Sequence, residues 1–184
     1  MRHVFRGARR IGALALVAMI CGAARPAQQR RVIDPIDPSW LSFDAATKTA
    51  RFRLTAGLTG VNGALNFNGF RDGELTLVVP EGWTVAVSFE NHDGMLPHSA
   101  QVIGEQHPLP ASALDKSGID RAFTNKAFEG LAPQSKDNMR FTAAPVGNYQ
   151  IVCGVPGHAL AGMWIRMQVS SDAKQPSVIA TPAP

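Results

Sequence analysis

The stretch from Cys153 to Met163 restricts the possible folds of this chain more than any other part of the sequence. It places a thiol at Cys153, an imidazole at His158 and a thioether at Met163, with four residues between successive members. Four of the eight spacer residues are Gly or Pro, which are typical of tight turns. The fold must therefore provide a short, sharply turned loop that can direct all three side chains toward one point.

A fourth candidate ligand, His98, lies upstream in the sequence Leu-Pro-His-Ser, just before a short apolar run. Two His, one Cys and a weakly bound Met form the ligand set of a blue-copper electron-transfer site. Zinc gains little from a thioether, so the same set fits zinc less well. The sequence therefore predicts one type 1 copper ion held by His98, Cys153, His158 and Met163.

Each of these residues also has an ordinary structural interpretation. Cys153 and Met163 are residue types that fill apolar cores, and His158 would be a common loop residue. A Cys/His nucleophile pair is a further alternative, although the Cys and His of proteases usually lie far apart in sequence. The combination of all three in one Gly/Pro-rich loop favours the metal site over these alternatives.

Several short motifs resemble the cupredoxins and, among them, the sulfocyanin/rusticyanin group. They are Asn66-Phe-Asn-Gly69, Pro80-Glu-Gly-Trp83-Thr-Val, and the Cys153 loop ending in Gly162-Met163-Trp164. The lead-in with Gly147 and Tyr149 ahead of Cys153 is similar to the Greek-key tyrosine turn of that family. The resemblance covers roughly residues 65–169.

This resemblance implies an exported one-electron shuttle in a respiratory-type chain. Its redox protein partners would dock near His158, and a quinol-oxidising complex and a terminal oxidase are the implied partners. The resemblance also implies that the backbone N–H groups of Ser99 and Val155 donate to the Cys153 sulfur and tune the reduction potential. Ser99 stands where many cupredoxins carry Asn, which favours a high potential.

Alternation of apolar and polar residues predicts an all-β fold from Trp40 onward. Apolar side chains recur at every second position in five segments, which are 52–56, 75–79, 85–89, 149–153 and 163–169. Because strand side chains alternate between two faces, Cys153 and Met163 fall on the buried face of their strands. The prediction is one cupredoxin-like Greek-key β-sandwich domain over residues 40–169.

Three regions outside this pattern have separate predictions. Residues 104–134 lack the alternation of apolar and polar residues. We predict that they form one long, partly helical crossover between strands. Residues 28–39 predict a linker or a loose first strand, and residues 170–184, rich in Pro, Ala and Ser, a disordered tail. His92 and His107 fall in turn-forming segments, so we expect exposed loop residues without a role at the metal.

Residues 1–27 are typical of a signal peptide, with a basic segment, a short apolar run and small residues for cleavage. Cleavage would release the protein into the periplasm or another extracytoplasmic compartment, whereas an uncleaved segment would anchor it to the membrane. The segment holds five Arg and no carboxylate, so its removal changes the formal charge from +4 to −1. Nucleic-acid binding then loses its only support.

Without that segment the chain has a single Cys, Cys153, so an intramolecular disulfide is excluded. We also expect a monomer. A copper enzyme would need further His-rich sites, for which only His92 and His107 remain. A periplasmic copper chaperone or storage protein is the alternative to an electron carrier. It would favour exposed, labile donors, whereas the predicted ligands lie on buried strand faces and in a constrained loop.

Overall fold

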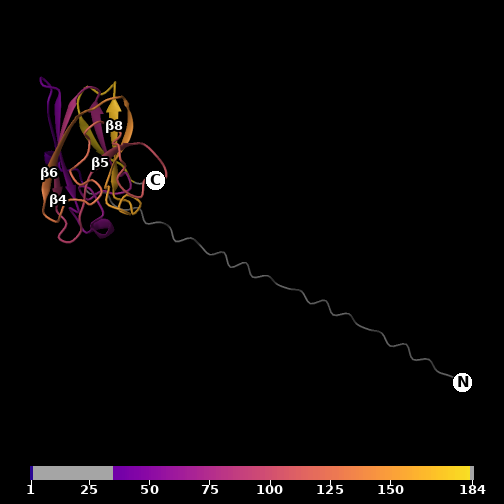
Figure 1. Cartoon of the computed structure of the whole chain (residues 1–184). Helices are drawn as coiled ribbons and strands as arrows, with labels where there is room; N and C mark the ends of the chain where they lie inside the picture. Colours follow the sequence, from indigo (N-terminus) through magenta and orange to yellow (C-terminus); the bar gives the residue numbers. More distant parts are fainter. Residues whose placement is uncertain (2–34, 183–184) are drawn as a thin grey trace. The chain divides into compact units, whose positions relative to one another are not determined.

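The computed structural model describes Met1 and residues 35–182, and two β-sheets pack face to face in it (Figure 1). The predicted signal peptide lies outside the described residues, apart from Met1. The first sheet has the strand order β1-β2-β4-β6 and the second β5-β7-β8-β3-β9. The strands are Leu41–Asp44 (β1), Thr49–Ala56 (β2), Leu75–Pro80 (β3), Thr84–Asn91 (β4), Gln101–Gly104 (β5), Lys136–Thr142 (β6), Gly147–Val152 (β7), Trp164–Ser170 (β8) and Ser177–Ala180 (β9). The predicted all-β sandwich is confirmed.

Two short 3-10 helices complete the described secondary structure. They are Pro38–Trp40 (η1) and Val61–Ala64 (η2). The side chain of Asp37 caps η1 by accepting a hydrogen bond from the backbone N–H of Ser39 at 2.8 Å. The described part of the predicted linker therefore ends in a capped helical turn. Neither helix has the length or apolar character that crossing a membrane requires.

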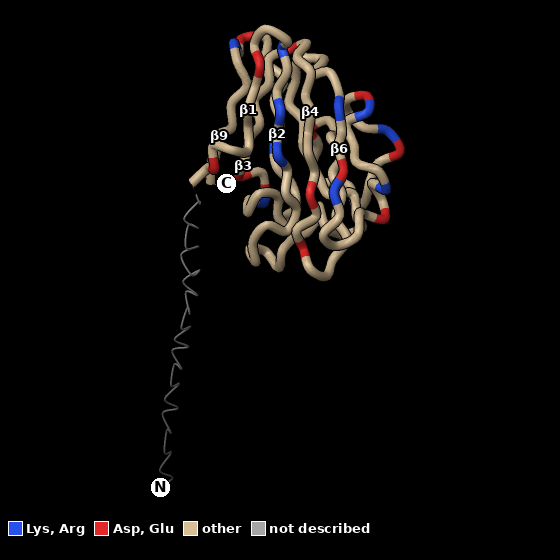
Figure 2. Tube along the Cα trace, turned by 90° about the vertical axis from the view of Figure 1, so that its left-hand side faces the viewer, with Lys and Arg blue, Asp and Glu red and all other residues tan. Residues whose placement is uncertain are grey.

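The alternating pattern explains why the first sheet forms. In β2, Phe52 and Leu54 are buried between the sheets, while Arg51 and Arg53 face outward. Figure 2 shows these basic positions in blue along β2. β2 pairs in parallel with β4, which alternates in the same way and pairs antiparallel with β6. One face of this sheet therefore forms one wall of the core.

The second sheet is buried on both faces around β7 and β8. Ile151 and Ile165 point into the core between the sheets. On the opposite face, Val152 and Trp164 form a second apolar cluster that includes Leu109 of the crossover. The hydroxyl of Tyr149 donates to the carbonyl of Pro145 at 2.8 Å, which fixes the turn before β7.

The crossover between β5 and β6 differs from its prediction, because residues 105–135 contain turns and isolated bridges but no helix. Its backbone groups instead pair with the strand that precedes it. Val102 donates to the carbonyl of Ala122 at 2.8 Å, and Gly118 donates to the carbonyl of Val102 at 2.8 Å. Hydrogen bonds of this kind compete with the local i to i−4 bonds of a helix and fix an irregular path.

The predicted disordered tail also differs in the structure. Residues 177–180 form β9, which pairs antiparallel with β3, and Val178 packs against the core. Thr181 continues this pairing by donating to the carbonyl of Glu74 at 2.7 Å. The edge of β3 that faces away from β8 supplies the hydrogen-bond partners of β9. The composition of the tail does not reveal these partners.

Candidate metal centre

The candidate ligands of the Cys153 loop meet because this loop connects two neighbouring antiparallel strands. β7 ends at Val152 and β8 begins at Trp164, so Cys153 and Met163 stand directly at the strand ends. The backbone N–H of Cys153 donates to the carbonyl of Met163 at 3.1 Å. The N–H of Met163 in turn donates to the carbonyl of His158 at 3.0 Å. All three residues are therefore held at one end of the sandwich.

His98 reaches the same place from the loop before β5. In the antiparallel pair of β5 and β7, Gln101 lies opposite Val152, so the residues just before β5 lie beside those just after β7. The backbone of His98 exchanges hydrogen bonds of 3.2 and 2.8 Å with Leu131 of the crossover. The imidazole is fully buried.

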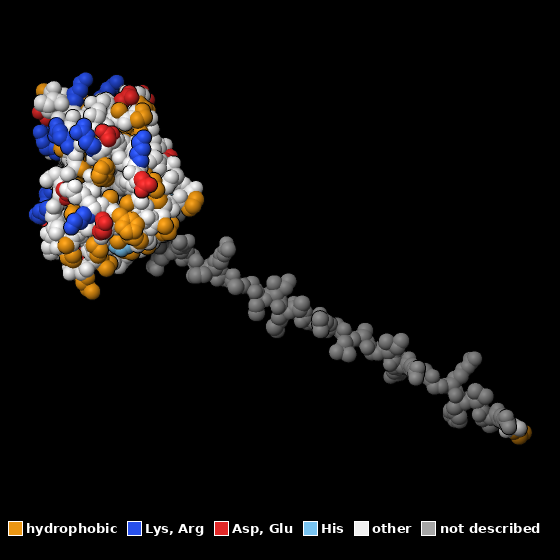
Figure 3. Space-filling model, in the orientation of Figure 1, with side chains coloured by type: hydrophobic (Ala, Val, Ile, Leu, Met, Phe, Trp, Pro, Cys, Tyr) orange, Lys and Arg blue, Asp and Glu red, His pale blue; other side chains and the backbone are white. Residues whose placement is uncertain are grey.

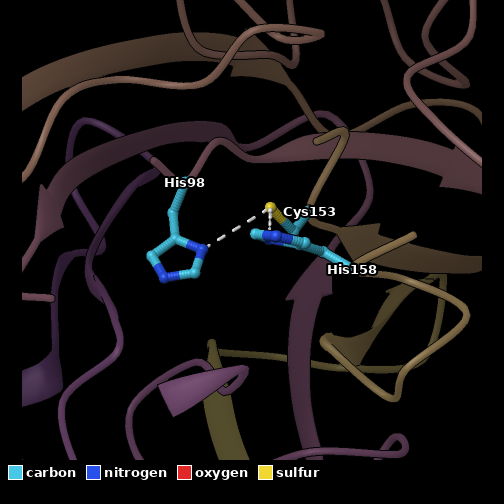
Figure 4. Close-up of side chains that lie close together, drawn as sticks. All are labelled: His98, Cys153 and His158. Carbon is cyan, nitrogen blue, oxygen red and sulfur yellow. Dashed lines mark hydrogen bonds between the residues drawn. The ribbon is translucent and has the colours of Figure 1, made fainter. Parts of the chain in front are cut away.

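The sulfur of Cys153 faces both imidazole rings, which are themselves neighbours with 5.1 Å between their centroids (Figure 4). The distance from Sγ is 3.5 Å to Nδ1 of His158 and 3.9 Å to Nδ1 of His98. One donor atom from each residue lies within 4.8 Å of the others. Within residues 35–182 no other group of three His, Cys, Asp or Glu side chains meets this condition.

These distances fit a single metal ion bound by all three atoms. Bonds of about 2.3 Å to sulfur and about 2.0 Å to nitrogen, as at zinc, separate the two donors by roughly 3.7 Å in a trigonal plane. The observed separations of 3.5 and 3.9 Å lie on either side of that value. Met163 is fully buried and close to the other three, and it adds a thioether. A set with soft sulfur and imidazole donors and no oxygen ligand matches copper.

The other two histidines in the described region lie apart from this group. His92 is exposed, and its Nδ1 lies 3.9 Å from a carboxylate oxygen of Glu90. His107 is also exposed and packs edge-on against Trp164, with 6.1 Å between the ring centroids. Both therefore have the exposed positions that the sequence predicts.

The sulfur environment combines deep burial with hydrogen-bond donors. The backbone N–H of Ser99 donates to Sγ of Cys153 at 3.5 Å, and the Ser99 hydroxyl lies 3.9 Å away. Burial raises the pKa of the Cys153 thiol, while hydrogen bonds from the N–H groups of Ser99 and Val155 act in the opposite direction. Metal binding must therefore displace the thiol proton, after which these N–H groups stabilise the thiolate.

The environment of both imidazoles favours their neutral, metal-binding form. Burial lowers the pKa of His98, against an opposing effect of Asp93. Burial also lowers the pKa of His158, helped by the neighbouring His98. A low pKa favours the deprotonated ring nitrogen, which is the form that binds a metal.

Asp93 is a functional candidate that the sequence analysis does not identify. Its Oδ2 lies 3.0 Å from Nε2 of His98, and the residue is almost fully buried. Burial acts to raise the pKa of Asp93, but hydrogen bonds from Met95, His98 and Leu96 outweigh it and leave the pKa below its usual value. The only sequence signal is an Asp followed by Gly in the turn five residues before a candidate ligand.

The crossover encloses the ligand loop from outside. Ala113 donates to the carbonyl of Gly154 at 2.7 Å, and Gly157 donates to the carbonyl of Ala111 at 2.8 Å. The hydroxyl of Ser99 donates to the carbonyl of Ala127 at 2.6 Å and accepts from the N–H of Gly154 at 3.0 Å. Residues 111–127 thus hold the loop in a fixed conformation around the sulfur.

Comparisons with known proteins agree with this arrangement. The sulfocyanin (SoxE) domain family matches residues 38–180. A sulfocyanin of Sulfolobus acidocaldarius is 28% identical over 143 residues, which cover 74% of this chain and 71% of that protein.

Solved structures of rusticyanin are also similar. Rusticyanin from Thiobacillus ferrooxidans has 29% identity and a TM-score of 0.52, over 67% of this chain and 78% of that one. A structure of reduced rusticyanin has 28% identity and a TM-score of 0.52, over 67% and 80% of the two chains. The resemblance predicted from the sequence motifs is confirmed.

Proposed function

This chain belongs to the sulfocyanin family of cupredoxins, and on that basis we propose that it is an extracytoplasmic one-electron carrier. Its cofactor is one copper ion, which His98, Cys153, His158 and Met163 would hold, with the thioether of Met163 as the weakest donor. Bound copper supplies the one-electron chemistry. The protein supplies the ligands, excludes water and transforms no substrate.

The observation that carries this proposal is the buried Sγ atom, which lies 3.5 Å from Nδ1 of His158 and 3.9 Å from Nδ1 of His98. The three donors come from strand ends and from loops that backbone hydrogen bonds hold in place. A rigid ligand set changes little between two oxidation states, so little reorganisation opposes electron transfer. Whether such a geometry is strained or intrinsic to copper–thiolate bonding does not alter this consequence.

The same burial disfavours the alternative of a copper chaperone or storage protein. Cys153 and His98 have no exposed surface, and only His158 is partly exposed. A protein that hands over its metal must let an acceptor reach the donor atoms. Slow exchange is therefore expected here, which suits a carrier that keeps its copper.

Copper reconstitution of the metal-free protein tests the proposed function. We expect it to bind one equivalent of Cu(II), to develop intense visible absorption from the Cys153 thiolate, and to be reduced and reoxidised reversibly. A chelator should remove the copper slowly. Rapid and complete removal would instead support the chaperone, and binding without the visible band would exclude a type 1 site.

The surface near His158 supports a place for partner docking. Exposed apolar residues lie on both ligand loops, among them Met95, Leu96 and Leu160, which are 85%, 38% and 57% exposed. Pro156 and Ala161 are exposed beside Leu160. We call these five residues the apolar collar. Figure 3 shows hydrophobic side chains gathered at the lower end of the domain, with Lys and Arg prominent elsewhere.

We propose that redox protein partners dock on the apolar collar and exchange electrons through the His158 edge. A quinol-oxidising complex and a terminal oxidase are the partners that the family resemblance favours. A small, mainly apolar contact suits a transient complex, because it forms without strong ion pairs and dissociates quickly.

Leu160→Asp is expected to slow electron self-exchange by roughly tenfold, because docking would then desolvate an unpaired carboxylate at a cost of about 1–3 kcal/mol. The visible spectrum should remain that of the unmodified protein. Self-exchange can be measured by NMR line broadening in mixtures of the oxidised and reduced protein.

The matched control is Val146→Asp, which adds the same charge to an exposed apolar position in the turn before β7. β7 runs from this turn toward Cys153, so the control lies about 20 Å from the site. Equal exchange rates in the two variants would move the docking surface away from Leu160.

A further inference from the structure

The hydrogen bond between Asp93 and His98 determines which ring nitrogen is free to bind a metal. A neutral imidazole carries one proton, on either Nδ1 or Nε2. Nε2 lies 3.0 Å from Oδ2 of Asp93, and an ionised carboxylate can only accept, so the proton lies on Nε2. Nδ1 then presents its lone pair toward Sγ of Cys153, 3.9 Å away.

Asp93 is itself held rigidly by its loop. Its Oδ1 accepts hydrogen bonds from the backbone N–H groups of Met95 at 2.8 Å and Leu96 at 3.2 Å. Its own N–H donates to Oδ1 of Asn91 at 3.0 Å. The amide of Asn91 donates in turn to the carbonyls of Leu96 and Leu131, at 2.9 and 3.0 Å. The carboxylate therefore cannot rotate away from His98 without breaking this network.

These contacts require an acceptor on both sides of the Asp93 side chain. Oδ1 faces two N–H donors and Oδ2 faces the ring N–H of His98. An Asn side chain in the same position would turn its NH₂ group toward one of these donors. Only a carboxylate can accept hydrogen bonds at both positions, so the site requires the negative charge of Asp93.

The charge of Asp93 also acts on the metal. The side chain is 8% exposed, and within residues 35–182 no Lys or Arg forms an ion pair with it. Cu(II) with the Cys153 thiolate carries one net positive charge, whereas Cu(I) with the thiolate is neutral. A buried negative charge next to a ligand therefore stabilises the oxidised site relative to the reduced one.

We propose that Asp93 is a positioning residue that holds His98 in the Nε2–H tautomer and lowers the reduction potential of the copper. This inference rests on the proposed copper site. The effect of Asp93 on the reduction potential is opposite to that of the N–H groups directed at the sulfur. Those N–H groups stabilise the electron-rich thiolate of the reduced form. The potential is then set by a balance between donors on the Cys153 side and an acceptor on the His98 side.

Asp93→Asn tests the effect on the potential. Loss of the hydrogen-bond partner of a metal-binding His typically weakens metal binding by about 10–100-fold. If Cu(II) binding weakens by about tenfold more than Cu(I) binding, the potential rises by about 59 mV. At saturating copper the visible band should persist, because Cys153 and both imidazoles remain. Voltammetry of the copper-loaded variant measures the shift.

Glu90→Gln is the matched control, because it removes one negative charge at the end of β4, three residues from Asp93, without contact to a candidate ligand. Its potential should stay close to that of the unmodified protein. An equal potential in the unmodified protein and Asp93→Asn would overturn the effect of the charge. A rise of the same size in both variants would show that general surface charge, and not the His98 contact, is responsible.

Nitrogen-15 NMR of the metal-free, unmodified protein tests the tautomer without any variant or copper. The chemical shifts should assign the proton of His98 to Nε2. A proton on Nδ1 would overturn the positioning role. If the protein failed to form a blue copper site, the proposed function would be lost, while the NMR result would still decide the tautomer.

Discussion

A Cys153→Ser variant is expected to lose the intense visible absorption of the copper-loaded protein completely. That absorption arises from charge transfer between a thiolate and Cu(II), and Cys153 is the only Cys in the described residues. A serine hydroxyl remains protonated at neutral pH and is a hard, weak donor to copper. Absorption spectra after addition of one equivalent of Cu(II) measure the loss.

The variant should still fold, because Ser is close to Cys in size and the N–H of Ser99 can donate to its oxygen. Circular dichroism and denaturant unfolding of the metal-free proteins check this. His92→Ala and His107→Ala are the controls, since both residues are exposed and outside the ligand group. Both should keep the full band. A band that survives in Cys153→Ser would place the copper elsewhere.

Gly154→Ala is expected to reduce the free energy of unfolding by at least about 1–3 kcal/mol, the usual cost of overpacking. A Cβ atom at this position would overlap the carbonyl oxygen of Ala127 and lie 2.7 Å from Cβ of Ala113. Both neighbours belong to the crossover, and one clash involves backbone, so relief requires the loop to move. Urea unfolding of the metal-free protein measures the loss.

The same displacement should disturb the metal site, because Gly154 directly follows Cys153. A shifted visible band in the copper-loaded variant would report it. Gly104→Ala is the control, since a Cβ there has no heavy atom within 4 Å and the backbone is not left-handed. That change should be neutral or stabilise the protein by about 0.4–1 kcal/mol. Equal unfolding free energies in the two variants would mean that the crossover does not pack tightly on the loop.

The sequence alone predicts the central strands and the approach of the three candidate ligands within the Cys153 loop. Alternation with period two identifies the cores of β2, β3, β4, β7 and β8. It also places Cys153 and Met163 on one buried face, and the structure buries both. These features are local, because a strand pattern and a turn-rich loop depend on neighbouring residues only.

The crossover could not be predicted in this way, because distant contacts determine its path. The helical structure predicted within residues 104–134 competes with backbone bonds to β5 and to the ligand loop. Ala111 and Ala113 bond to the ligand loop through backbone atoms, and Ala127 accepts from the Ser99 hydroxyl through its carbonyl. Backbone contacts of this kind leave no trace in residue type. Asp93 was missed for a related reason, since its role depends on the direction of a side chain in a turn.

The position of β9 has a consequence for solubility. β3 lies between β8 and β9, so all of its ladder partners are within the same chain. Without β9, the outer edge of β3 would have unpaired N–H and C=O groups. Such an edge is a template on which a second molecule can add a strand and begin aggregation. β9 is a four-residue strand, and it presents only a short edge of its own. Residues 177–180 therefore cover the edge of β3 with which a second molecule could otherwise pair.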